Sequence, residues 1–190
     1  LVERLHARFD GRADVLETGQ PLAPAAALAL LEPPAAARPP LALAVGDAAS
    51  IEGTDYVVDA AVAYGGERAW REYRLRDASV ERWLVVGPDG GLALVQPTPA
   101  APSGHDAAGP DGPYPEEISH EGRTYRRAAH GQATARLTGP GGGQAGVPVA
   151  YADYADAADG CLTIRDWGAE RRVAVGTVID PALVSVYPRA

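Results

Sequence analysis

A short turn of the form Ile-Glu-Gly-x-x-Tyr occurs twice in the chain and constrains its fold more than any other feature. The first copy runs from Ile51 to Tyr56, and the second runs from Ile118 to Tyr125 with two extra residues. Glycine can adopt the positive φ that a tight hairpin requires, and the tyrosine can then pack across the two strands. The pattern predicts two β-hairpins, which reflect either a duplicated unit or the reuse of a common turn.

Apolar and polar residues alternate on both sides of these turns. In residues 69–76, Tyr73 and Leu75 fall on one face of an expected strand, whereas Trp70 and Glu72 fall on the other. Segments of this kind recur at intervals of about 8–12 residues and are separated by glycine turns, which is typical of antiparallel sheets. The sequence therefore predicts a mostly β fold made of two related antiparallel halves, each a β-meander or small barrel.

The composition changes along the chain and suggests four segments. Residues 1–40 combine two short helical patterns with a Pro/Ala-rich stretch, so we expect short N-terminal helices there. Residues 41–96 form the first expected β half and residues 114–190 the second. Residues 97–113, rich in Pro, Ala, Gly and Ser, are expected to be a linker.

Charge and cysteine content exclude several classes of function. The formal net charge is −8 and the basic residues are scattered apart from pairs such as Arg171-Arg172, so we expect no nucleic-acid partner. A lone cysteine, Cys161, forms no intrachain disulfide and fits a reducing compartment. The longest apolar stretch is too short for a transmembrane helix, which needs about 20 residues. We therefore expect a cytoplasmic protein that is not transmembrane.

No complete cofactor or metal motif is present. The stretch 141–146 fits G-x-G-x-x-G, but the strand-like Val147-Pro148 follows it where a dinucleotide site needs a helix, so we predict a hairpin loop. A P-loop is excluded because the chain has no lysine. The histidines lack the spacing of a zinc site. We expect no cofactor, no metal and no catalytic residue with an assigned role.

An aromatic cluster beside a carboxylate is the best candidate for a binding surface. Trp70 and Glu72 share a strand face, Tyr73 follows them, and Trp83 lies on the expected neighbouring strand. Aromatic rings next to a carboxylate suit a ligand, a cation or a protein partner. The alternative interpretation is a packed layer of the core.

The same residues resemble a known family. The run Trp70-x-Glu72-Tyr73-x-Leu75, with Trp83-Leu84 after it, is similar to the DUF4178 family, and the hairpin motifs extend the resemblance from about residue 41 to residue 188. The resemblance implies a mostly β bacterial domain of unknown function whose genes lie near polyamine aminopropyltransferases and small membrane proteins. It carries no catalytic residues over to this chain.

Three functions remain open on the sequence. The leading hypothesis is a non-catalytic β-rich module that binds a protein partner or a small ligand through Trp70, Glu72, Tyr73 and Trp83, in a polyamine- or membrane-associated system. The second is a small enzyme with a cross-strand site drawn from His120, Glu121, His130 and Cys161. The third is a scaffold that forms homo-oligomers.

Overall fold

The computed structural model describes residues 41–77, 80–103, 114–140, 143–168 and 170–189. Contacts divide the chain into residues 1–38 and 39–190, and all described residues belong to the second unit. The short helices predicted for residues 1–40 lie outside the described residues.

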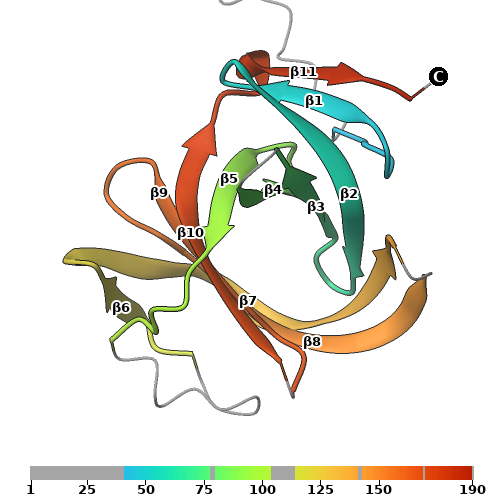
Figure 1. The fold of residues 1–190 in the computed structure, drawn as a ribbon. Coiled ribbons are helices and arrows are strands. Elements are labelled where there is room, and N and C mark those ends of the chain that lie inside the picture. The colour runs from blue at the N-terminus through green and yellow to red at the C-terminus, as the bar shows by residue number, and fades with distance from the viewer. Residues whose placement is uncertain (1–40, 78–79, 104–113, 141–142, 169, 190) are drawn as a thin grey trace, which may run out of the picture. The chain divides into compact units, whose positions relative to one another are not determined.

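β-strands account for nearly all of the regular structure in the described part of the chain, which confirms the mostly β prediction. The single helical element among these residues is a three-residue 3₁₀ turn, Pro181–Leu183. The described residues form no α-helix. In that described part, no helix is long and apolar enough to cross a membrane. The strands, drawn in Figure 1, are β1 (Ala48–Ile51), β2 (Thr54–Gly65), β3 (Trp70–Arg76), β4 (Glu81–Val86), β5 (Leu92–Pro97), β6 (Glu117–His120), β7 (Arg123–Thr138), β8 (Gln144–Ala155), β9 (Gly160–Asp166), β10 (Arg171–Ile179) and β11 (Val184–Tyr187).

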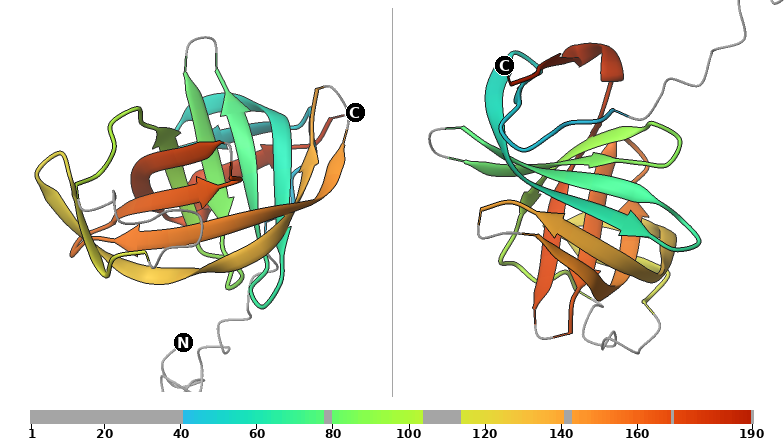
Figure 2. Two further views of the ribbon diagram at one scale, coloured as in Figure 1. Left: turned by 90° about the horizontal axis from the view of Figure 1, so that it is seen from below. Right: turned by 90° about the vertical axis from the view of Figure 1, so that its right-hand side faces the viewer.

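All eleven strands belong to one antiparallel sheet with the order β11-β1-β2-β3-β4-β5-β10-β9-β8-β7-β6. Two meanders, β1–β5 and β6–β10, are joined where β5 pairs with β10 (Figures 1 and 2), so the strands form a single sheet instead of two closed barrels. A second junction pairs Ala61–Gly65 of β2 with Thr134–Thr138 of β7. Because the first residues of β2 pair with β1 instead, the ring that this junction closes is partial.

Both repeated turns connect paired antiparallel strands, as the sequence predicts. Glu52 and Gly53 have φ values of 51° and 80°, and Glu121 and Gly122 have φ values of 48° and 77°. Positive φ at both central residues is the signature of a type I′ turn, whose twist matches that of the flanking strands. The glycine-rich loop before β8 also joins antiparallel neighbours, since Leu137 pairs with Gln144, and the hairpin predicted there is confirmed.

The junction between β5 and β10 depends on a close backbone approach. A Cβ atom on Gly176 of β10 would lie 1.9 Å from the carbonyl oxygen of Leu94 on β5. Only glycine leaves room for the two strands to come this close. Gly176 therefore permits β5 and β10 to approach closely at this point of the junction.

The alternation of the strands sends side chains to two different sides of the sheet. One face of β3 contributes Tyr73 and Leu75 to an apolar core shared by β1 to β5. The other face contributes Trp70, which packs with Trp83 of β4 and Tyr151 of β8 in the interior of the ring. The same interior receives the polar side chains that form the candidate site.

Candidate functional site

Glu72 of β3 is fully buried and accepts four hydrogen bonds from side chains on four strands. Its Oε1 accepts from Arg165 Nε at 2.7 Å and from Trp70 Nε1 at 3.2 Å. Its Oε2 accepts from Tyr64 OH at 3.2 Å and from Arg172 Nη2. Both oxygens are thereby saturated, and the carboxylate ties together β2, β3, β9 and β10.

The two guanidinium groups keep this carboxylate ionised. Burial alone would raise the pKa of Glu72, but the positive charges of Arg165 and Arg172 outweigh it and hold the pKa at about 2. Burial alone would lower the pKa of Arg165, but the Asp153 and Glu72 carboxylates raise it above its ordinary value. Two acids and two arginines thus form a charge-balanced network that is buried except at Asp153.

Arg165 fills an aromatic cage inside the ring. Its guanidinium carbon lies 5.2 Å from the ring centroid of Trp70, and 5.9 Å from those of Tyr64 and Tyr151. Its Nη1 donates to Asp153 Oδ1 at 2.7 Å, and its side chain is completely shielded from solvent. The aromatic face predicted to receive a cation is therefore occupied by a cation of the chain itself.

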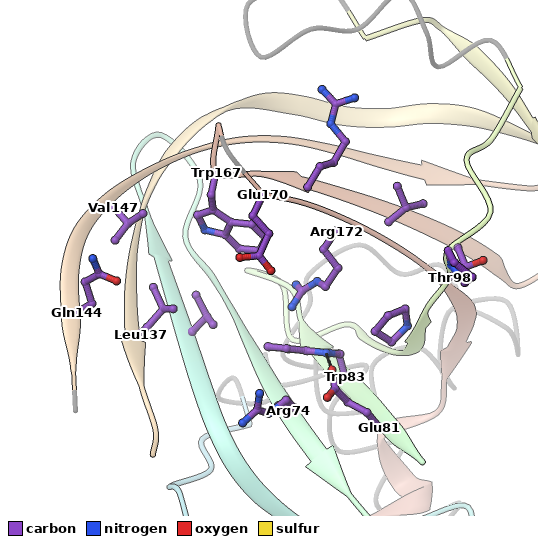
Figure 3. Close-up of a pocket in the computed structure, with 15 residues that line it drawn as sticks. Arg74, Glu81, Trp83, Thr98, Leu137, Gln144, Val147, Trp167, Glu170 and Arg172 are labelled. Carbon is purple, nitrogen blue, oxygen red and sulfur yellow. Dashed lines mark hydrogen bonds between the residues drawn. The ribbon is translucent and has the colours of Figure 1, made fainter. Parts of the chain in front are cut away.

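Arg172, the second partner of Glu72, lies at the wall of a groove. Its guanidinium carbon is 3.8 Å from the ring centroid of Trp83 and 5.4 Å from that of Trp167, and Figure 3 shows the side chain between the two rings. The groove has a volume of about 720 Å³. Its apolar wall also includes Val62, Leu137, Val147, Val173, Pro97 and Pro99.

Two buried N–H groups at this wall lack an acceptor. Among the described residues, neither Arg172 Nε nor Trp167 Nε1 has a hydrogen-bond partner. A buried donor without an acceptor costs about 1–3 kcal/mol, so such groups call for a physical explanation. An acceptor atom of a molecule bound in the groove would supply one.

The structure brings together three of the four residues predicted for the binding surface. Trp70 and Glu72 lie in the buried network, and Trp83 lines the groove. Tyr73 points to the opposite side of β3, where its hydroxyl accepts a hydrogen bond from the backbone N–H of Leu43 at 3.2 Å. Tyr73 therefore does not share a surface with the other three.

Sequence reasoning did not find Arg165, Arg172 and Trp167. Arg165 carries a faint signal, because it is a charged residue directly after the mostly apolar run from Cys161 to Ile164. Arg172 was recognised only as a member of the basic pair Arg171-Arg172. Glu72 is 93 residues from Arg165 and 100 residues from Arg172 along the chain. A local pattern does not predict which strands so far apart come together.

The residues of the alternative enzyme site are dispersed over several elements. His120 ends β6, with its Nε2 4.0 Å from Glu121 Oε1 in the adjoining turn, whereas His130 is exposed on β7. Cys161 is buried on β9, where burial, aided by nearby carboxylates, raises the pKa of its thiol to about 11. Throughout the described ranges, no group of three or more His, Cys, Asp or Glu side chains is placed to hold a metal ion.

Comparison with known proteins places most of this sheet in one family. A family model described as "Domain of unknown function (DUF4178)" matches residues 44–181, which include Glu72, Arg165, Arg172 and both junctions of the sheet. No curated protein and no solved structure gives a match.

Proposed function

The chain belongs to the DUF4178 family, and from the geometry of its site we propose that it is a non-catalytic module that binds a small ligand in the groove beside Trp83, Trp167 and Arg172. The observation that carries this proposal is the pair of buried donors, Arg172 Nε and Trp167 Nε1, at the wall of the groove. The volume of about 720 Å³ is within the usual range of ligand pockets, roughly 300–1,000 Å³.

The charges around the groove indicate what kind of ligand it takes. Each of its three arginines is already bonded to an acid: Arg172 to Glu72, Arg171 to Asp166 and Arg74 to Asp59. Two further carboxylates, Glu81 and Glu170, also line the groove. Neither of them forms an ion pair with any described residue. The groove therefore repels anions although three of its residues are arginines.

An uncharged molecule with an apolar ring and a carbonyl or hydroxyl oxygen satisfies these constraints. The ring would pack on the apolar wall, and the oxygen would accept hydrogen bonds from Trp167 Nε1 and Arg172 Nε. Arg172 Nη2 donates to the Glu72 carboxylate, and this bond fixes the position of the guanidinium group. Arg172 Nε is therefore positioned before a ligand binds.

A fragment screen tests this proposal. Uncharged, anionic and cationic ring compounds of similar size are titrated into the full chain, and binding is followed by tryptophan fluorescence and by NMR shifts. We expect saturable binding of uncharged compounds that carry an acceptor oxygen. The variant Trp167→Phe keeps an aromatic ring but removes the N–H, and it should weaken binding roughly fivefold, for a hydrogen bond worth about 1 kcal/mol.

Tyr187→Phe is the matched control, because it removes one hydroxyl from an exposed ring on β11, outside the groove. It should leave the affinity unchanged. The proposal fails if no uncharged compound binds, if anionic compounds bind best, or if Trp167→Phe binds as well as the unaltered chain.

We also propose that the two meanders are related by duplication. The repeated turns share their conformation, with positive φ at Glu52-Gly53 and at Glu121-Gly122. The strands that would be equivalent, β2 with β7 and β5 with β10, pair with each other antiparallel, as a twofold relation between the halves requires. In a crystal structure of the chain, the two meanders should superpose strand for strand. A best superposition with a shifted strand order would contradict the duplication.

A further inference from the structure

A second hollow lies at the junction between β2 and β7, on the face of the sheet opposite to Glu72 and the ring interior. Its volume is about 280 Å³, and its lining includes Ala61, Ala63, Arg71, Arg136 and Thr138. We propose that Arg71 and Arg136 form a binding site here for the phosphate group of a small molecule. This site is separate from the groove and does not depend on the function proposed for it.

The strand register places the two arginines on either side of one small residue. Ala63 of β2 pairs with Arg71 of β3 and also with Arg136 of β7. Residues at paired positions project on the same face, and neighbouring strands are about 4.8 Å apart, so the two arginine α-carbons are separated by roughly 10 Å. The methyl group of Ala63 leaves open the space between them, where both guanidinium groups can reach one anion.

Neither arginine is neutralised by the protein. Within the described ranges, the side chains of Arg71 and Arg136 form no hydrogen bond and no ion pair. None of the residues that line the hollow carries a carboxylate. In the same ranges of this chain, whose net charge is −8, seven other arginines do form ion pairs: Arg74, Arg76, Arg123, Arg126, Arg165, Arg171 and Arg172. Two like charges left together without an acid favour the binding of an anion.

The donors suit an oxyanion with several oxygens. A guanidinium group donates two parallel hydrogen bonds to a phosphate, and two such groups can grip different oxygen pairs of the same ion. Thr138 lines the hollow from β7 and adds a hydroxyl donor. The space of about 280 Å³ accommodates a phosphate group and a small substituent.

Titration with inorganic phosphate tests the site, with chloride at equal ionic strength to account for screening. Backbone NMR shifts should saturate and should cluster on β2, β3 and β7. Arg71→Gln and Arg136→Gln should each weaken binding about tenfold or more, which is typical of losing a hydrogen bond to a charged group. Ala63→Leu fills the space between the arginines while it keeps every charge, and it should abolish binding.

Arg126→Gln is the matched control, because it removes one exposed positive charge from another part of β7. It should bind phosphate as the unaltered chain does. The proposal is overturned if phosphate has no more effect than chloride, if Ala63→Leu binds normally, or if Arg126→Gln weakens binding as much as Arg71→Gln. Thermal unfolding of each variant verifies that the fold is retained, and Trp167→Phe should leave phosphate binding intact.

Discussion

Two arginines share the carboxylate of Glu72, but they lie in different surroundings. The Arg165 side chain is 0% exposed and is enclosed by three aromatic rings of the chain itself. The Arg172 side chain is 13% exposed and lines a groove between Trp83 and Trp167. Both retain an N–H group without an acceptor among the described residues, but only Arg172 faces a space that a ligand could enter.

This difference shows how to interpret aromatic residues gathered around a charge. Rings and a carboxylate close in sequence suggest a site for an external cation. Around Arg165, the chain supplies that cation itself, so the cluster stabilises the fold. Around Arg172, donors without an internal acceptor lie beside an open groove, and this is where we propose that a ligand binds.

The largest effect is expected from Glu72→Gln, which removes the charge shared by both arginines. Breaking a buried ion pair leaves an uncompensated charge and costs about 3–5 kcal/mol. We expect the free energy of unfolding at pH 7 to fall by about 4 kcal/mol, as measured by urea denaturation. The exposed pair of Glu117 and Arg126 provides the control, and Glu117→Gln should cost less than about 1 kcal/mol. Similar losses of unfolding free energy in the two variants would show that the buried ion pairs contribute no more stability than an exposed one.

Acid should weaken the network through the same carboxylate. The pKa of Glu72 is about 2 in the folded chain and 4.5 as its ordinary value, so unfolding takes up a proton in this range. The stabilisation, about 3 kcal/mol, is fully present above pH 4.5 and is lost as the pH falls towards 2. As the pH is lowered from 6 to 3, the unfolding free energy should therefore fall more steeply for the Glu117→Gln control than for Glu72→Gln. Equal slopes would mean that Glu72 does not contribute to acid unfolding.

Arg165→Met tests the enclosed side of the comparison. Methionine fills much of the same space, but Glu72 and Asp153 each lose a partner, and we expect the unfolding free energy to fall by about 3 kcal/mol. Ligand affinity in the groove, measured by the fluorescence titration, should stay within about twofold of the unaltered chain. If ligand binding disappears while the variant remains folded, the two sides do not have separate roles.

Arg172→Met should give the opposite result. Glu72 keeps its bond to Arg165, and methionine can still pack on Trp83, so we expect a loss of stability of only about 1–2 kcal/mol. Ligand affinity should fall about tenfold, because the donor at the wall of the groove is removed. Unchanged ligand affinity together with a large loss of stability would place Arg172 among the structural residues, like Arg165.

The sequence predicted the local parts of this protein well, because local rules govern them. A two-residue turn that ends in glycine, between alternating flanks, favours a hairpin, and both Glu-Gly copies form one here. Alternation also placed Trp70 and Glu72 on one face of β3. It places the neighbouring Tyr73 on the opposite face, which explains why Tyr73 lies apart from the other predicted site residues.

The candidate site was only half visible from the sequence. The register of the β3–β4 hairpin pairs Arg74 with Trp83, so Trp83 falls on the same face as Glu72, as adjacency in sequence suggested. Arg165, Arg172 and Trp167 come from β9, β10 and the turn between them, across the junction of β5 with β10. The alternation of apolar and polar residues does not predict that β5 pairs with β10, because the alternation is the same whichever strand lies at an edge.

By itself, the amino-acid sequence determined the mostly β fold, the two Glu-Gly turns and the opposite faces of β3 on which Tyr73 and Glu72 lie. The tertiary structure decided which strand edges meet: β5 with β10 and β2 with β7. Local turn chemistry and alternation act over a few residues, whereas these junctions bring together residues far apart in the chain, whose pairing is favoured only once the interior is packed. Those two junctions place both guanidinium groups on Glu72, and they create the groove and the hollow beside Ala63.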